Sequence, residues 1–344
     1  MLAFACPTCE RLVTFESTAC LNCGSKLGYD PATRTIETLH GANSERVFHR
    51  CANVGLAACN WLVTAEGELC ESCLLTRTRP NDGDADALIG FASAEGAKRR
   101  LLFELAQLEL PIGSWREREG GLAFDLLSSA GGPVTTGHAD GLITLDLDEA
   151  DPAHRERMRV HLGEPYRTVL GHLRHEVGHY YQPILLGEGT PAQARSRELF
   201  GDEREDYKQA MDRYYEQGAP ADWEQRFVSA YATMHPWEDW AETFAHYLHI
   251  RDTLQTAAAY GVRVDGPSIP TADRAPLHSV PDHAPDDVRT MLEAWLPMTY
   301  ALNAISRSMG MPDLYPFVLS REVEAKLAFI HERVSHVGLL TAGV

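Results

Sequence analysis

The sequence contains no uninterrupted run of about 18 apolar residues, so no segment is expected to span a bilayer. Basic residues are also scarce: 31 Lys and Arg stand against 49 Asp and Glu, which gives a formal net charge of −18. We expect phosphates to repel so acidic a chain, which argues against nucleic acids and anionic membranes as partners. Its 344 residues, 44% of them hydrophobic, suffice for two domains with a sizeable core.

Cysteine is missing from the whole chain after Cys73. A secretory signal is missing as well, because the first residues, MLAFACPTCE, have neither a basic region nor a continuous apolar one. We therefore expect a cytoplasmic protein. In a reducing compartment thiols persist, so clustered cysteines favour metal binding over a disulfide framework.

The cysteines that are present form two sets of four, and both sets have spacings typical of zinc ligands. The first set reads C-x2-C-x10-C-x2-C and consists of Cys6, Cys9, Cys20 and Cys23. The second set reads C-x7-C-x10-C-x2-C and consists of Cys51, Cys59, Cys70 and Cys73. Its first half is irregular, and His49 is an alternative ligand there. Short C-x2-C knuckles hold thiolates at tetrahedral spacing, so we predict two structural zinc sites in a zinc-ribbon-like domain over residues 1–80.

The charge of this cysteine-rich segment bears on its partners. Residues 1–80 carry nearly equal numbers of acidic and basic side chains, and each four-thiolate zinc site would add about two negative charges. Nucleic-acid binding through this domain is therefore disfavoured. We expect a structural module, or one that docks a protein partner.

The remainder of the chain has a mostly helical pattern. Residues 81–92, rich in Asp, Gly and Asn, are predicted to be a linker to a second domain over 93–344. Alternating apolar residues predict strands over 121–128 and 141–147. A proline-rich surface loop is expected over 262–287. Apolar periodicity, caps and prolines predict helices over 93–108, 166–181, 222–234, 236–250, 289–308 and 320–336.

The motif HEVGH carries the most specific chemistry. A spacing of four places the imidazoles of His175 and His179 on one helix face, where both can bind one zinc ion. Glu176 then lies beside the metal, where it can take a proton from an attacking water. The alternative is a solvated helix with two surface histidines, but the apolar and aromatic residues around the motif favour a buried helix.

A catalytic zinc site needs a third protein ligand and one open position. Glu238 and Glu242 lie four residues apart in a predicted helix, so their carboxylates face the same way. One of them can bind the metal while the other accepts the free N–H of a ligating histidine.

The stretch Y-A-x5-E-x2-A-E-x-F, from Tyr231 to Phe244, resembles the corresponding stretch of lethal-factor-like gluzincins. The resemblance implies that Glu238 is the third ligand, that Glu242 supports a histidine and that Tyr231 points at the developing oxyanion. The separation of His179 from Glu238 is longer than in compact gluzincins. The alternative third ligands are therefore Glu242, Asp239 and His246.

Most of the chain is similar to a bacterial family of zinc-binding metallopeptidases with an N-terminal zinc ribbon. The similarity rests on the cysteine knuckles and on five strings: CNW (59–61), TGHADGLITLDLDEAD (136–151), YRTVLGHLRHEVGHYY (166–181), ELFGDEREDY (198–207) and HPWEDWAETFAHYLHI (235–250). It implies an α+β fold, in which a mostly helical zincin-like domain with a small antiparallel sheet follows the cysteine-rich domain. In such folds the strand before the active-site helix, here residues 142–147, can pair with an extended peptide.

Three further histidines are expected to play supporting parts. His172 is predicted to pack in the core or to bond a ligand, His235 to cap a helix, and His138 to lie in a turn.

These observations predict a zinc metallopeptidase with one catalytic and two structural zinc ions. Its substrate would be a peptide or protein, cut at a peptide or isopeptide bond. The rival hypotheses are a zinc-binding scaffold or docking protein that cuts nothing and, less favoured, a regulator that binds nucleic acid through the cysteine domain.

Overall fold

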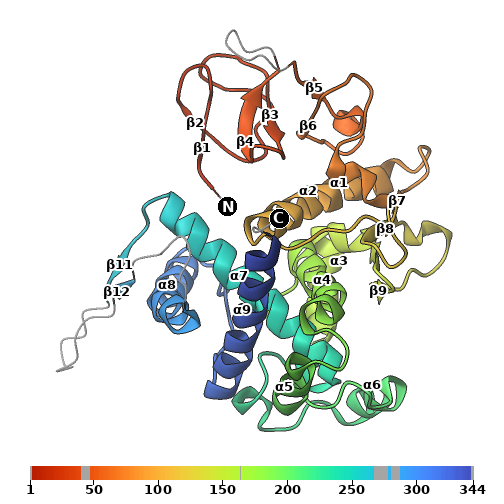
Figure 1. Ribbon diagram of the computed structural model, residues 1–344, viewed down its shortest axis with the longest axis vertical. Coiled ribbons are helices and arrows are strands. Elements are labelled where there is room, and N and C mark those ends of the chain that lie inside the picture. Colours follow the sequence, from red (N-terminus) through yellow and green to blue (C-terminus); the bar gives the residue numbers. More distant parts are fainter. Residues whose placement is uncertain (1, 40–46, 163, 267–277, 280–286, 342–344) are drawn as a thin grey trace. The chain divides into compact units, whose positions relative to one another are not determined.

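The computed structural model describes residues 2–39, 47–162, 164–266, 278–279 and 287–341 (Figure 1). The chain forms two compact units. The first contains the described residues of Met1–Gln107, Pro111–Leu162 and Arg167–Leu173, and the second contains those of Leu108–Leu110, Gly163–Tyr166 and Arg174–Val344. No helix among the described residues is long and apolar enough to cross a membrane.

The first unit begins with three small antiparallel ribbons that carry the cysteines. They are formed by β1 (Phe4–Ala5) with β2 (Leu12–Val13), β3 (Leu27–Asp30) with β4 (Thr35–Thr38), and β5 (His49–Arg50) with β6 (Leu62–Val63). A 3₁₀ turn, η1 (Ala52–Val54), and a short helix, α1 (Glu71–Leu74), complete the segment. Its core is aromatic, because Phe4, Phe15 and Tyr29 pack around Phe103 of α2 (Ala85–Gln107).

A four-stranded sheet follows, with the order β7-β8-β10-β9. Its strands are β7 (Thr76–Thr78), β8 (Ala123–Leu127), β9 (Gly137–Ala139) and β10 (Leu142–Asp146). β9 and β10 form a hairpin, whereas β8 pairs in parallel with both β7 and β10. This sheet is therefore mixed, while the ribbons are antiparallel. The 3₁₀ turns η2 (Ser129–Gly131) and η3 (Leu147–Ala150) and the helix α3 (Pro152–Leu162) complete the unit, and the α+β class is confirmed.

The predicted linker over 81–92 is wrong from residue 85 onward, because α2 already begins at Ala85. The Asp84 carboxylate accepts the backbone N–H of Ala87 and so caps the helix, nine residues before residue 93, where the helix was predicted to begin. Gly90 then allows the helix to approach η3, since an added Cβ would lie 3.1 Å from the carbonyl oxygen of Leu147.

The second unit is almost wholly helical. Its elements are α4 (Val169–Leu186, from Arg174 onward), α5 (Pro191–Phe200), α6 (Tyr207–Gln217), η4 (Trp223–Gln225), η5 (Tyr231–Thr233), α7 (Pro236–Ala259), α8 (Val288–Ser308), α9 (Arg321–Thr341) and the short pair β11 (Val264–Asp265) and β12 (His278–Ser279). The long helix α7 packs against η5, α5, α8 and α9 (Figure 1). Trp240, Phe244 and Tyr247 of α7 are fully buried, so this helix forms the centre of the core.

Other helix boundaries differ from the predictions as well, and two of these differences have a local cause. Residues 222–234 form two 3₁₀ turns in place of one helix, because the carbonyl of Arg226 accepts a bond from Lys326 and the Ser229 hydroxyl accepts the N–H of Ala232. The helix expected to begin near Pro165 begins at Val169, where the Thr168 hydroxyl accepts the N–H of Gly171. Most of the expected loop over 262–287 lies outside the described residues.

Candidate metal centres

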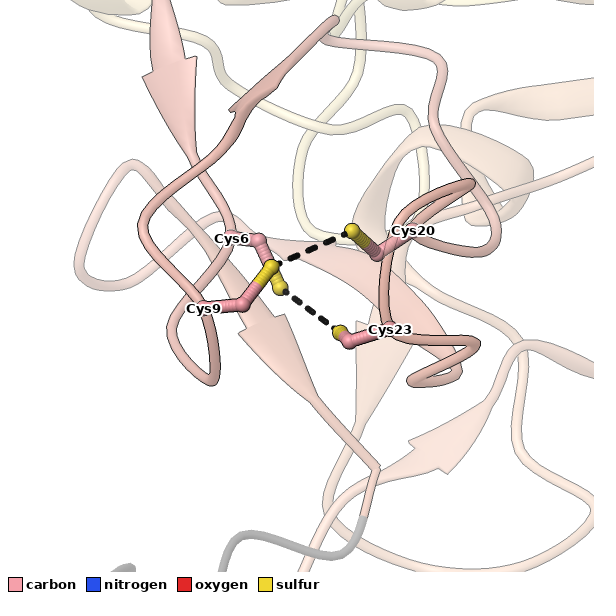
Figure 2. Close-up of side chains that lie close together, drawn as sticks. All are labelled: Cys6, Cys9, Cys20 and Cys23. Carbon is pink, nitrogen blue, oxygen red and sulfur yellow. Dashed lines mark hydrogen bonds between the residues drawn. The ribbon is translucent and has the colours of Figure 1, made fainter.

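The first cysteine set converges from two knuckles of the first unit. Figure 2 shows Cys6 and Cys9 facing Cys20 and Cys23. Two sulfur–sulfur distances across the group are 3.7 Å (Cys6 to Cys23) and 3.6 Å (Cys9 to Cys20). Four thiolates at about 2.3 Å from one zinc ion would stand about 3.8 Å apart. These separations therefore fit a tetrahedral zinc site, and they are far too long for disulfide bonds.

The second set converges in the same way and is completely buried. The sulfurs of Cys59 and Cys70 are 3.6 Å apart, and the backbone N–H of Cys70 donates to the sulfur of Cys51 at 3.3 Å. All four ligand atoms of this group are cysteine sulfurs, so the alternative ligand His49 is not part of it. Arg99 of α2 donates to the carbonyls of Ala57 and Ala58, both at 3.2 Å, and thereby holds the irregular loop between the first two cysteines.

A third group of possible ligands joins α4 and α7 in the second unit. The Nε2 atoms of His175 and His179 are 3.2 Å apart, and Oε2 of Glu238 lies 3.0 Å from the first and 3.6 Å from the second. Ligands at 2.0–2.1 Å from a tetrahedral zinc ion would be about 3.3–3.4 Å apart. The three atoms thus occupy one face of a tetrahedron of the right size for zinc.

The protonation of His175 gives a second test of the fit. Its Nδ1 lies 2.7 Å from Oε1 of Glu242, and an ionised carboxylate can only accept a hydrogen bond, so Nδ1 carries the proton. The lone pair of a neutral Nε2 would then face Oε2 of Glu238 directly. Although burial lowers the pKa of His175, the two carboxylates raise it well above its usual range. The arrangement calls for a cation among these three atoms, and a divalent metal meets that need.

Close packing of the two helices brings these ligands together. Gly178, inside the HEVGH motif, lies against Ala241, since an added Cβ would be 3.0 Å from the Cα of Ala241. The indole Nε1 of Trp240 donates to the carbonyl of Gly178 at 3.0 Å. The missing side chain at position 178 therefore allows α4 to approach α7 at the level of the two histidines.

Glu242 is itself held in place. Its Oε2 accepts the hydroxyl of Ser229 at 2.6 Å, while its Oε1 faces His175. Burial alone would raise the pKa of Glu242, but the contacts with His175 outweigh it and the pKa falls to about 2. The carboxylate therefore stays ionised and fixes the orientation of the imidazole.

Glu176 and Tyr231 line the same centre. Glu176 is buried next to His175 in the chain, and burial raises the pKa of its carboxyl. The ring of Tyr231 lies 6.0 Å from the ring of His175, centroid to centroid, and burial raises the pKa of its phenol. The structure thus brings together the residues predicted from the sequence.

The alternative third ligands have other partners. Oδ2 of Asp239 accepts Nζ of Lys326 at 2.6 Å, a buried pair between α7 and α9. The Nδ1 atom of His246 lies 2.7 Å from the hydroxyl of Tyr315. Of the candidate carboxylates, Glu238 is the one that faces both histidines.

Of the three other histidines, His235 has its predicted part, whereas His138, predicted in a turn, lies in strand β9. The Nδ1 atom of His235 accepts the N–H of Trp237 and caps α7, and Nε2 of His138 accepts the N–H of Gly141 in the β9–β10 turn. His172 belongs to none of the possible ligand groups in the described part of the chain.

Two residues of the site were missed by the sequence analysis. The hydroxyl of Tyr207 donates to Oε1 of Glu238 at 2.9 Å, and Ser229 bonds Glu242. Tyr207 closes the string ELFGDEREDY, so the family resemblance drew attention to that stretch without indicating a role.

The comparisons with known proteins agree with these features. Residues 3–84 match a zinc-ribbon domain family, and residues 88–333 match a family described as "Putative zinc-binding metallo-peptidase". Uncharacterized proteins from two strains of Mycobacterium tuberculosis and one of Mycobacterium bovis are each 50% identical over 340 residues, which cover 98% of this chain and 96% of each relative. No solved structure matches the chain significantly. Because the second family match spans well over half of the residues, the chain belongs to this family of zinc-binding metallo-peptidases.

Proposed function

We propose that the protein is a zinc-dependent peptidase that hydrolyses peptide or isopeptide bonds in the cytoplasm. The observation that carries the proposal is the convergence of His175, His179 and Glu238 within 3.0–3.6 Å of one another, with Glu176 beside them on α4. In this proposal one metal site is catalytic and the two cysteine sites are structural. The cysteine-rich segment is either purely structural or also docks a protein partner.

The three ligands would hold a zinc ion, and zinc in such a site supplies Lewis-acid chemistry, since it polarises a carbonyl and makes water a better nucleophile at neutral pH. Glu176 takes a proton from the attacking water and passes it to the leaving amine. Its buried position suits this task, because the raised pKa of its carboxyl makes it a stronger base than a solvated glutamate.

Tyr231 has the complementary role in this scheme. Its phenol keeps its proton at neutral pH, since burial raises its pKa, and it can donate a hydrogen bond to the oxyanion that forms from the carbonyl. Glu242 and Ser229 keep the His175 ring in the orientation that presents Nε2 to the metal.

The first experiment replaces the base. The Glu176→Gln variant keeps the shape of the side chain and all three ligands, so we expect it to bind three zinc ions per chain and to lose hydrolysis of a peptide library. Glu188→Gln, which removes an exposed carboxylate just after α4, is the matched control and should cleave like the unaltered chain.

A cleavage assay distinguishes the proposed peptidase from the alternative, a zinc-binding scaffold. A scaffold that cuts nothing would bind the same number of zinc ions, so metal content cannot distinguish the two. Hydrolysis that persists in Glu176→Gln would contradict the proposed base. A chain that binds all three ions and cuts no peptide or isopeptide bond would favour the scaffold.

A further inference from the structure

The two carboxylate oxygens of Glu238 have different surroundings. Oε2 faces the Nε2 atoms of His175 and His179, at 3.0 and 3.6 Å. Oε1 points to the other side, where it accepts the hydroxyl of Tyr207 at 2.9 Å. The side chain of Glu238 is almost fully buried, so this phenol stands where water would otherwise solvate the second oxygen.

The direction of the hydrogen bond between Tyr207 and Glu238 follows from the acceptor. A carboxylate accepts only, so the Tyr207 proton goes to Glu238.

Local structure fixes Tyr207 independently of this bond. It is the first residue of α6, whose N-terminus is capped by the Asp206 carboxylate through the N–H of Gln209 at 2.9 Å. The Tyr207 ring packs against His235, with centroids 5.2 Å apart, and against Trp237 at 5.9 Å. The ring would keep these contacts if only the hydroxyl were removed.

We propose that Tyr207 is a positioning residue that occupies Oε1 of Glu238, so that the carboxylate offers only Oε2 to a metal ion. This role rests on the proposed function. A glutamate held in this way binds through one oxygen, which keeps the ion four-coordinate with one position open for substrate. Freed from Tyr207, Oε1 could turn toward the ion and fill that position.

The test is Tyr207→Phe, with Tyr215→Phe as the matched control, because Tyr215 lies on the same helix and is 68% exposed. In both chains the cysteine sites retain zinc and the third site is reloaded with cobalt(II). We expect the visible absorption of Tyr207→Phe to weaken, as it does when cobalt changes from four to five ligands. Its zinc affinity at the third site should fall by roughly 10- to 100-fold.

The control should keep the spectrum and affinity of the unaltered chain. Thermal unfolding of the metal-free proteins shows whether the ring still packs. We expect one cooperative transition for both variants, with Tyr207→Phe melting a few degrees lower because Oε1 of Glu238 loses its hydrogen bond. An unchanged cobalt spectrum and unchanged zinc affinity in Tyr207→Phe would overturn the role of Tyr207 and leave the proposed function standing. An unaltered chain that binds metal only at its cysteine sites would overturn both.

Discussion

At the scale of single residues, the centre is a set of acceptors that only a cation can hold together. The ring of His175 lies between two carboxylates, and its two nitrogens serve different purposes. Nδ1 bonds Oε1 of Glu242, and Oε2 of Glu242 accepts the hydroxyl of Ser229. Because Nδ1 of His175 and both oxygens of Glu242 have partners within the protein, Nε2 of His175 is the atom left to face the possible metal position.

Tyr231 gives a prediction at this scale. Tyr231→Phe removes one hydrogen-bond donor and keeps the ring next to His175, so kcat should fall about 100-fold or more while KM and zinc content stay the same. Steady-state kinetics and metal analysis check this, with Tyr215→Phe as a control. If kcat is unchanged, Tyr231 has no part in stabilising the oxyanion.

The residues of the centre divide into those that the sequence could predict and those that it could not. His175 with His179, and Glu238 with Glu242, each lie within one helix at a spacing of four, so helical geometry alone places each pair on a common face. Tyr207 reaches Glu238 across 31 residues of chain, and only tertiary packing determines that approach. No local pattern marks such a contact.

At the scale of elements, the site depends on how closely α4 approaches α7. Gly178→Ala would place a methyl group 3.0 Å from the Cα of Ala241 and 3.3 Å from the Cβ of Phe244, both in a packed core. Backbone atoms cannot move aside without strain, so the two helices should separate by a few tenths of an ångström. This should lower the free energy of unfolding by about 1–3 kcal/mol. The affinity of the third site for zinc should fall as well, because His179 moves away from Glu238.

Denaturant unfolding and zinc titration measure these two effects. Gly189→Ala is not a suitable control, because Gly189 has a φ of +70° and an alanine there would be strained. Gly96→Ala, within helix α2, where an added Cβ would meet no atom closer than 3.8 Å, is the better comparison and should leave zinc affinity at the third site unchanged. A Gly178→Ala chain as stable and as tightly zinc-bound as the unaltered one would show that the helices do not need this contact.

The prediction for residues 222–234 failed at the element scale for an identifiable reason. The apolar spacing of Trp223, Phe227 and Tyr231 is that of a helix, yet the carbonyl of Arg226 bonds Lys326 instead of the N–H one helical turn ahead. Lys326 comes from α9, 100 residues further along the chain. A partner so remote leaves no trace in the local periodicity.

At the scale of the whole molecule, the family matches and the compact units divide the chain differently. The zinc-ribbon match ends at residue 84 and the peptidase match begins at 88, close to the boundary at residue 80 predicted from the sequence. The first compact unit, however, contains the cysteine segment together with the four-stranded sheet. The reason is β7, which directly follows the second cysteine set and pairs with β8.

Removal of residues 1–80 tests whether the second predicted domain can fold without β7. Deletion exposes the edge of β8, removes the partner of the Asp125 carboxylate, Arg77, and takes Thr76 from the fully buried pair of Glu95 and Lys98. Burying charges without their partners is costly. We therefore expect the shortened chain to lose its cooperative thermal transition, as followed by circular dichroism.

Arg77→Met in the full chain removes the ion pair with Asp125 but leaves strand β7 in place. It therefore distinguishes the contribution of the strand from that of the ion pair. Arg77 is 43% exposed but the Asp125 side chain is only 10% exposed, so losing the pair should cost about 1–3 kcal/mol, and this variant should still unfold cooperatively. If the shortened chain melts at the temperature of the full protein and still binds a metal ion through its histidines, the boundary at residue 80 separates two independent folding units. If the shortened chain fails to fold while Arg77→Met folds, β7 belongs to the same folding unit as β8, and that unit extends from the cysteine segment well into the peptidase match.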